Sequence, residues 1–220
     1  MTPPEAARAQ RTKKRTRIQL ANEEKILDAA LEVFSTYGFR GATVDQIAER
    51  AGMTKPNLLY YFRRKEDIYR AVLQHTLDIW LAPLTALGES DDPITELKAY
   101  IDRKLELSRD NPKASRLFAL EILQGAPIIG DVLAGSLKQL VDEKAEVIRR
   151  WIVQGRIAPV DPYHLIFTIW ATTQHYADFD AQVHAVLGID PASTAHFPTA
   201  AKTLEDLILG GLCLERPGKD

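Results

Sequence analysis

Three residues with binding chemistry recur at four-residue steps in the segment 168–179, TIWATTQHYADF. They are Trp170, Gln174 and Asp178, and residues four apart on an α-helix lie on adjacent turns of one face. An amide donates and accepts hydrogen bonds, a carboxylate accepts them, and an indole offers a flat apolar surface. Together they would suit a small planar molecule with adjacent N–H and C=O groups. Uracil, thymine and other cyclic imides have this pattern.

We call these three residues the polar stripe. The alternative interpretation is that they have a purely structural role. Trp170 would then be a core residue, Gln174 would bond a backbone carbonyl, and Asp178 would pair with an arginine near the helix end. Burying an amide and a carboxylate without partners is costly. If the polar stripe faces the interior, a ligand that satisfies both groups is therefore the better explanation.

Helical periodicity extends over most of the chain and supplies the elements that must position the polar stripe. Asp161 and Pro162 have the N-cap and first-turn positions of a helix start, which places the stripe in a helix beginning there. Trp80 lies in a long helix expected over 65–87 and offers a second aromatic wall. No strand pattern, internal repeat or glycine-rich phosphate loop occurs. The sequence predicts an all-α protein, with further helices at 94–109, 114–123, 131–154 and 199–212.

The segment 43–62, TVDQIAERAGMTKPNLLYYF, has the spacing of a helix-turn-helix. Thr43 and Gln46 have the capping-box spacing, in which each side chain satisfies a free backbone N–H group of the other residue. Gly52 fits the turn, and Thr54 is placed to cap the second helix. That second helix is the one that would enter the major groove of DNA.

The predicted recognition helix carries side chains suited to DNA at its N-terminal end. Lys55 and Asn57 can hydrogen-bond to base edges, and Pro56 can contact a thymine methyl group. Tyr60 can reach a sugar or a phosphate. The spacing alone is also compatible with an ordinary tight helical hairpin, but the residue types favour double-stranded operator DNA as a partner.

Charge is distributed unevenly along the chain. Residues 1–75 hold 14 Lys and Arg against 9 Asp and Glu, whereas residues 76–220 hold 14 against 21. Residues 1–20 are basic, lack apolar periodicity and are expected to form a flexible arm. A basic first third on an acidic remainder is typical of a protein that binds nucleic acid with one domain. Chance variation in surface charge is the alternative.

Composition limits the class of protein. The 220 residues are 45% hydrophobic and 26% charged, as in ordinary globular chains. No apolar run reaches the roughly 18 residues that cross a bilayer, and no signal peptide is recognisable, so we expect a cytoplasmic protein without membrane contact. Cys213 is the single cysteine, which excludes an internal disulfide or a cysteine metal cage, and its leucine neighbours predict a buried thiol.

Enzymatic chemistry has no support in the sequence. A helical enzyme acting on pyrimidines would need a nucleophile with its base, a set of metal ligands or a cofactor loop, and none is recognisable. We therefore expect no catalytic residue, no metal and no cofactor.

The N-terminal region resembles the DNA-binding head of the TetR family of bacterial repressors. The resemblance lies in a helix led by Glu23 and ended by Gly38, and in the segment YGFRGATVDQIAERAGMTKPNLLYYFRRKEDIY. It implies a helix-turn-helix domain over 21–66 and a ligand-binding and dimerisation domain over 67–220. It also implies that these residues face DNA: Thr43, Lys55, Asn57, Tyr60, Tyr61 and Lys65. For Tyr61, a role in the core of the head is an equal alternative.

The rest of the chain resembles pyrimidine-responsive regulators of the same family, in the segments LDIWLAPL, NPKASRLFALEILQGAP, VDEKAEVI and HLIFTIWATTQHYADF. The resemblance implies a repressor of pyrimidine catabolism genes that uracil or thymine releases from DNA. The ligand would be held by Trp80, Trp170, Gln174 and Asp178, with Phe118 as a further wall. A TetR-type repressor that senses a drug or lipophilic metabolite is the alternative.

The same resemblance implies a homodimer. Its helices would be those beginning near Asp161 and Thr199. Their apolar residues are suited to a helical interface: Leu165, Ile169, Leu204, Leu207 and Ile208.

Overall fold

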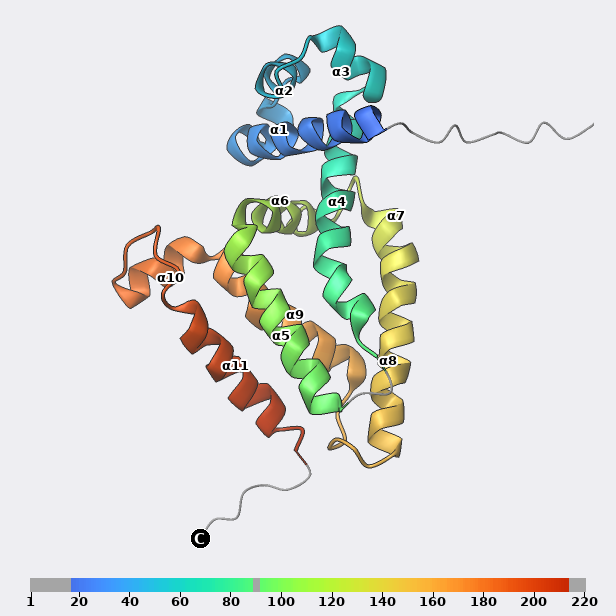
Figure 1. Cartoon of the computed structure of the whole chain (residues 1–220), viewed down its shortest axis with the longest axis vertical. Helices are drawn as coiled ribbons and strands as arrows, with labels where there is room; N and C mark the ends of the chain where they lie inside the picture. The colour runs from blue at the N-terminus through green and yellow to red at the C-terminus, as the bar shows by residue number, and fades with distance from the viewer. Residues whose placement is uncertain (1–16, 89–91, 214–220) are drawn as a thin grey trace, which may run out of the picture.

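A computed structural model describes residues 17–88 and 92–213 of the chain, and the described parts are all helical (Figure 1). A small head stands at one end of the molecule, and a larger helical body forms the rest. Helix α4 runs from beneath the head into the body and so belongs to both (Figure 1). The predicted all-α class is confirmed.

The head is built from three helices whose ends the sequence defines. They are α1 (Arg17–Gly41), α2 (Val44–Arg50) and α3 (Lys55–Tyr61). The predicted capping box is present, because the Gln46 N–H donates to Thr43 Oγ1 at 3.2 Å and the Thr43 N–H donates to Gln46 Oε1 at 2.8 Å. Thr54 caps α3. Gly52 in the turn has a φ of 66°, a conformation that side chains with a Cβ adopt rarely.

Helix α1 differs from the prediction at its start. It begins at Arg17 rather than near Glu23, so residues 17–20 of the predicted arm are helical. No glycine or proline separates these residues from the periodic segment, so the helix can extend toward the N-terminus. The remainder of the predicted arm, residues 1–16, lies outside the described residues. At the other end, Gly38 has φ 67° and ψ 173°, which interrupts the helix at the predicted glycine.

The body contains one helix that the sequence did not predict, α10, which is short because its Gly188 stop follows after only two turns. The predicted helix at 131–154 is divided, since a π-helical segment replaces α-helix over five of its residues. Proline stands at or next to the first position of several body helices, where its missing N–H costs nothing. The elements are α4 (Lys65–Ala86), α5 (Pro93–Asp110), α6 (Pro112–Leu123), α7 (Gly130–Val132), η1 (Leu133–Leu137), α8 (Lys138–Val153), α9 (Pro162–Asp178), α10 (Asp180–Leu187) and α11 (Phe197–Gly210).

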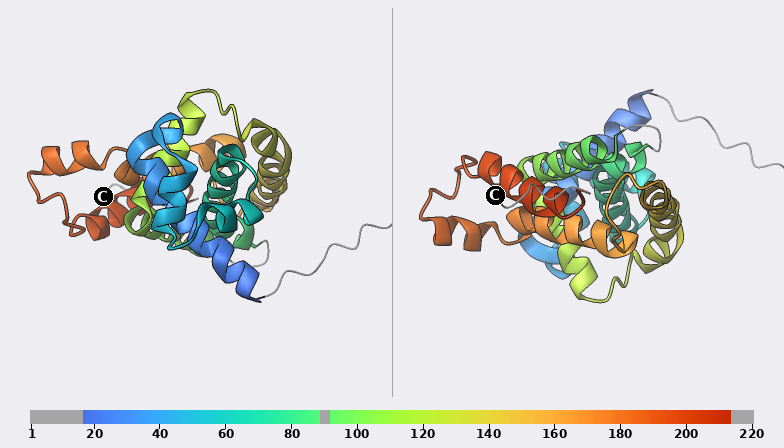
Figure 2. Two further views of the ribbon diagram at one scale, coloured as in Figure 1. Left: turned by 90° about the horizontal axis from the view of Figure 1, so that it is seen from above. Right: turned by 90° about the horizontal axis from the view of Figure 1, so that it is seen from below.

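Two clusters of buried apolar side chains hold the molecule together. The body cluster joins α5, α9 and α11 around residues such as Ile101 and Ile169. The head cluster extends beyond the head, because Phe34 of α1 and Ile68 of α4 share it with Leu117 of α6. Figure 2 shows the head packed over the end of the body, with α1 crossing above it. A displacement of α6 would therefore act directly on α1.

Three of the five apolar residues expected at the dimer interface are buried within the chain itself. Leu165, Ile169 and Leu204 belong to the body cluster, so the expectation that they contact a second chain is wrong. Helix α5 packs between α9 and α11 and covers the faces that these residues occupy. Leu207, by contrast, is 71% exposed, and Ile208 is partly buried against the body cluster.

Cys213 is exposed, so the predicted buried thiol is also wrong. It follows the end of α11, where Leu212 turns inward and its neighbour turns outward. Among the described residues, no helix is long and apolar enough to span a membrane.

Candidate ligand pocket and DNA-binding face

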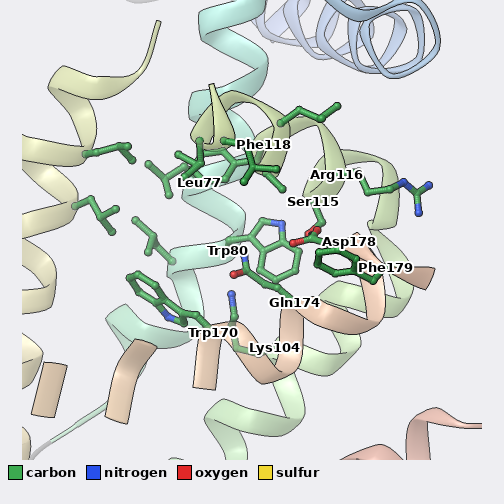
Figure 3. A pocket seen from close by; sticks show the side chains of 17 residues that line it. Leu77, Trp80, Lys104, Ser115, Arg116, Phe118, Trp170, Gln174, Asp178 and Phe179 are labelled. Carbon is green, nitrogen blue, oxygen red and sulfur yellow. The ribbon is translucent and has the colours of Figure 1, made fainter. Parts of the chain in front are cut away.

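A cavity of about 590 Å³ lies in the body between α4, α5, α6, η1 and α9. Its size falls in the range of roughly 300–1,000 Å³ that is usual for small-molecule sites. The structure brings all five predicted ligand residues to this cavity: Trp80, Phe118, Trp170, Gln174 and Asp178. Figure 3 shows them around a common space, although they come from three different helices.

The polar stripe of α9 faces the interior, as the binding interpretation requires. Gln174 is partly buried, and within the described part of the chain its amide has no hydrogen-bond partner. Asp178 does not pair with an arginine. Its Oδ1 accepts a hydrogen bond of 2.5 Å from the Ser115 hydroxyl of α6. Of the structural alternatives, neither the backbone bond of the glutamine nor the arginine pair is present among the described residues.

Lys104 of α5 is the pocket residue that the sequence analysis missed. Its side chain is 2% exposed, and its Nζ lies 3.8 Å from the centroid of the Trp80 ring. No hydrogen-bond acceptor within the described residues contacts this ammonium group. The missed signal was its register, because Tyr100, Lys104 and Ser108 follow one buried stripe of α5. A lysine on the buried face of an amphipathic helix is rare and points to a site.

Burial shifts the titration of both charged groups toward their neutral forms. Desolvation lowers the pKa of Lys104 to about 7, and the charge of Asp178 opposes that shift. Burial raises the pKa of Asp178, while the Ser115 hydrogen bond and the charges of Arg116 and Lys104 oppose the increase. Shifted pKa values in a cavity are typical of functional sites.

The Trp170 indole is held in place by its own hydrogen bond. Its Nε1 donates to the Tyr100 hydroxyl at 2.5 Å, and burial raises the pKa of that hydroxyl. The N–H group of Trp170 is therefore already used. What this residue offers a ligand is the flat apolar ring surface.

Four of the predicted DNA-contacting residues lie on the exposed side of α3. Lys55, Pro56, Asn57 and Tyr60 are all exposed, Tyr60 at 72%. Lys55 forms an ion pair of 2.8 Å with Asp45 of α2, so its ammonium is positioned by the neighbouring helix. Of the remaining predicted residues, Thr43 is exposed and its side chain is used in the α2 cap.

Tyr61 and Lys65 are partly buried, and both form hydrogen bonds within the head. The Tyr61 hydroxyl accepts a hydrogen bond of 2.8 Å from Asn22, and its ring packs against the head cluster. The Lys65 ammonium donates to the carbonyl oxygens of Phe39 at 2.7 Å and Ala42 at 2.8 Å. These side chains stabilise the end of α1 and the base of α3, which agrees with the core alternative for Tyr61.

No group of His, Cys, Asp and Glu side chains suited to a metal occurs within residues 17–88 and 92–213. The charged groups of the cavity are a single lysine, a single aspartate and the Arg116 guanidinium at its edge. The Arg116 guanidinium forms an ion pair with Asp180, with 2.5 Å between Nη1 and Oδ2.

Two family profiles match this chain and together cover most of it. The profile described as "Bacterial regulatory proteins, tetR family" matches residues 26–72. The profile described as "YcdC-like protein, C-terminal region" matches residues 73–215. The boundary between them lies in α4, the helix that the head and the body share.

A similar sequence and similar structures are also known. The HTH-type transcriptional regulator RutR of Escherichia coli (strain K12) is 51% identical over 201 residues, which cover 91% of this chain and 95% of that protein. A putative fatty acid metabolism regulator from Clostridium perfringens superposes with a TM-score of 0.66 at 24% identity, covering 87% of this chain and all of that one. The structure of AibR in complex with isovaleryl coenzyme A and operator DNA superposes with a TM-score of 0.64 at 19% identity, covering 84% of this chain and 97% of that one. The two structures share the fold.

Proposed function

The chain belongs to the TetR family of bacterial regulatory proteins and is a DNA-binding transcriptional regulator close to RutR, and from this premise we propose its signal and its mode of action. It represses genes of pyrimidine catabolism as a homodimer bound to operator DNA. Uracil or thymine in the body cavity releases it from that DNA.

The observation that carries this proposal is the set of polar groups left open in the cavity. The Gln174 amide has no partner among the described residues, and the Lys104 ammonium likewise has none. Asp178 has one carboxylate oxygen bonded to Ser115 and further acceptor capacity. These polar atoms are open to the cavity, where a ligand with matching donors and acceptors can pair with them.

The imide edge of a pyrimidine is complementary to these groups. Its carbonyl oxygens accept hydrogen bonds, as Lys104 and the Gln174 NH₂ require. Its ring N–H groups donate, as Asp178 and the Gln174 carbonyl require. Trp80 and Trp170 supply the apolar surfaces that a flat ring covers. Cytosine lacks the imide pattern and is expected to be rejected, because mismatched buried donors and acceptors would stay unpaired.

Signal transfer to DNA follows from the packing of α6. This helix lends Ser115 and Phe118 to the cavity and Leu117 to the head cluster. A ligand that binds one position of α6 better than another shifts the head between DNA-competent and DNA-incompetent arrangements. The coupling is reciprocal, so operator DNA must weaken pyrimidine binding by the same factor.

A thermal unfolding scan with uracil, thymine and cytosine tests the proposal. At about 100 times its dissociation constant, a ligand stabilises the folded state by roughly 2.7 kcal/mol. Uracil and thymine should raise the midpoint steadily with the logarithm of their concentration, and cytosine should not. An operator release assay with the same three compounds completes the test. Absence of any pyrimidine response would remove the proposed signal and leave a DNA-binding regulator.

A repressor that senses a drug or lipophilic metabolite is the second candidate, because most of the cavity lining is aliphatic or aromatic. It predicts thermal stabilisation by apolar compounds and none by pyrimidines. The open amide, ammonium and carboxylate would then have no role, which is why the pyrimidine is preferred.

A further inference from the structure

On the basis of the proposed function, we infer that the cavity has a second, apolar compartment that binds an apolar substituent on the pyrimidine ring. The preferred ligands are then uracils that carry an alkyl or aryl chain, and free uracil fills only the polar end. We call this compartment the apolar annex. It is lined by Leu77, Leu81, Phe118, Ala119, Leu133 and Leu137.

The chemistry of the cavity is divided between its two ends. Lys104, Ser115, Gln174 and Asp178 supply the polar groups of its interior, whereas the annex lining carries no polar side chain. In Figure 3, Leu77 and Phe118 lie on one side of the Trp80 indole, and Lys104 and Gln174 lie on the other. Ser115 and Asp178 lie beside the indole (Figure 3). The polar groups thus come from α5, α9 and Ser115 of α6, whereas the annex lining comes from α4, η1 and the following turn of α6.

The size of the cavity exceeds the need of a single pyrimidine ring. A volume of about 590 Å³ is typical of sites that bury drug-sized molecules. A six-membered ring held by the polar end would leave the annex to water, against surfaces that offer water no hydrogen bonds.

The annex is incompletely covered by the protein itself. Leu81, Phe118, Leu133 and Leu137 are only partly buried, although each lines the cavity. At its rim, Leu123 of α6 is 80% exposed. An apolar chain on the ligand would cover this surface, and burial of apolar surface favours binding.

The outer wall of the annex is an irregular helix. Leu133 and Leu137 are the first and last residues of η1, the π-helical segment before α8. π-helical segments are rare and occur frequently at functional sites. Here the wider turn sets the position of both leucines against the cavity.

The polar end argues against a simple fatty acid as the occupant. A carboxylate could pair with Lys104, but it would also face the Asp178 carboxylate, and like charges in a buried site repel. An uncharged imide avoids this repulsion and uses both groups. The occupant that satisfies both ends is therefore a neutral pyrimidine with an apolar chain.

Calorimetric titration of the full chain with uracil, 5-butyluracil and 6-butyluracil tests the inference. The two butyl compounds keep the imide edge and project the chain from neighbouring ring positions. Because each buried methylene is worth about a fourfold gain, at least one should bind at least tenfold more tightly than uracil, with a more negative heat-capacity change. 6-(3-Hydroxypropyl)uracil, of equal chain length, should show no such gain.

Variants locate the gain in the annex. Leu133→Trp should fill the annex, remove the advantage of the butyl chain and leave uracil binding unchanged. Ala119→Phe fills it from α6 and replaces the first variant if that one does not fold. Leu187→Trp, the same change at an exposed site on α10, is the matched control and should keep the full advantage.

Each outcome decides between the two proposals. If uracil binds and neither butyl compound binds more tightly, the annex is overturned and the proposed function stands. If a butyl compound binds and uracil does not, the annex stands and uracil is not the effector. Absence of binding by all three overturns both, and octanoate binding as tightly as butyluracil would overturn the requirement for a pyrimidine.

Discussion

At the level of single residues, Gln174 is a cavity side chain whose amide has no hydrogen-bond partner among the described residues. It faces the cavity between Trp170 and Asp178 on α9 and is remote from the head. Gln174→Ala should leave operator binding unchanged and abolish release by uracil, because the amide would pair with the ligand and not with DNA. A gel-shift titration with and without uracil measures both properties. Loss of operator binding in this variant would contradict the separation of the two functions.

Lys104 is expected to reduce the stability of the unliganded protein and to contribute to binding of the ligand. Lys104→Met keeps most of the side-chain volume and removes a buried charge that has no hydrogen-bond partner among the described residues, and burying such a charge is unfavourable. The variant should therefore unfold at a higher denaturant concentration near pH 7, yet bind uracil more weakly. Equilibrium unfolding and calorimetry give the two numbers. If the variant is less stable than the wild type and binds uracil equally well, Lys104 is not a ligand-binding residue.

The lowered pKa of Lys104 should also make the stability of the protein depend on pH. The folded-state pKa of Lys104 is about 7 and its ordinary value is 10.5, so between these values the unfolded chain binds more protons than the folded one. Stability must then rise with pH across this window. We expect wild type to gain stability relative to Lys104→Met between pH 7 and pH 9, by a few kcal/mol at most. An equal response of both proteins to pH would contradict the shift.

At the level of elements, α3 and the start of α4 divide the basic residues of the head by role. Lys55 is exposed on α3, whereas the Lys65 ammonium is bonded to carbonyl groups at the end of α1. Each phosphate contact contributes about one unit to the slope of log affinity against log salt concentration. Lys55→Met should reduce that slope by about one if Lys55 contacts a phosphate, and should alter base preference if it contacts a base.

Lys65→Met is the paired variant. It should lower thermal stability by about 1 kcal/mol, since two carbonyl groups lose a charged donor, and leave the salt slope unchanged. A reduced slope without loss of stability would show that Lys65 contacts DNA directly. Its ammonium would then have to break its hydrogen bonds to the carbonyl groups when DNA binds.

At the level of the whole molecule, the proposed dimer depends on surfaces that the body leaves exposed. Leu207 on α11 and Phe167 on α9 are large apolar residues exposed on the two helices expected to pair. Leu207→Glu should convert the dimer to monomers in sedimentation experiments. Operator affinity should then fall by orders of magnitude, because two linked heads bind with a high effective concentration.

Pyrimidine binding provides the control for the dimer variant. The cavity lies within one chain, and Leu207 does not line it. Uracil affinity per chain should therefore remain near that of the wild type. A dimer that persists with Leu207→Glu would place the interface elsewhere on the body.

The sequence by itself determined the all-α class, several helix ends and the chemical character of the site. Caps such as Thr43 and Asp161 define helix ends through local hydrogen bonds, and such bonds depend on neighbours in sequence. The four-residue step of the polar stripe likewise placed Trp170, Gln174 and Asp178 on one face. These features are local, so a linear pattern is sufficient to predict them.

Only the tertiary structure decided which faces meet. Lys104 is an ordinary lysine in sequence, and it becomes a pocket residue because α5 turns it toward Trp80 of α4. Leu165 and Leu204 were expected between chains, but α5 covers them within one chain. The hydrogen bond from the Lys65 ammonium to Phe39 at the end of α1 likewise joins segments that are distant in sequence. Burial depends on contacts between distant segments, and helical periodicity gives the apolar face of a helix without naming the surface that covers it.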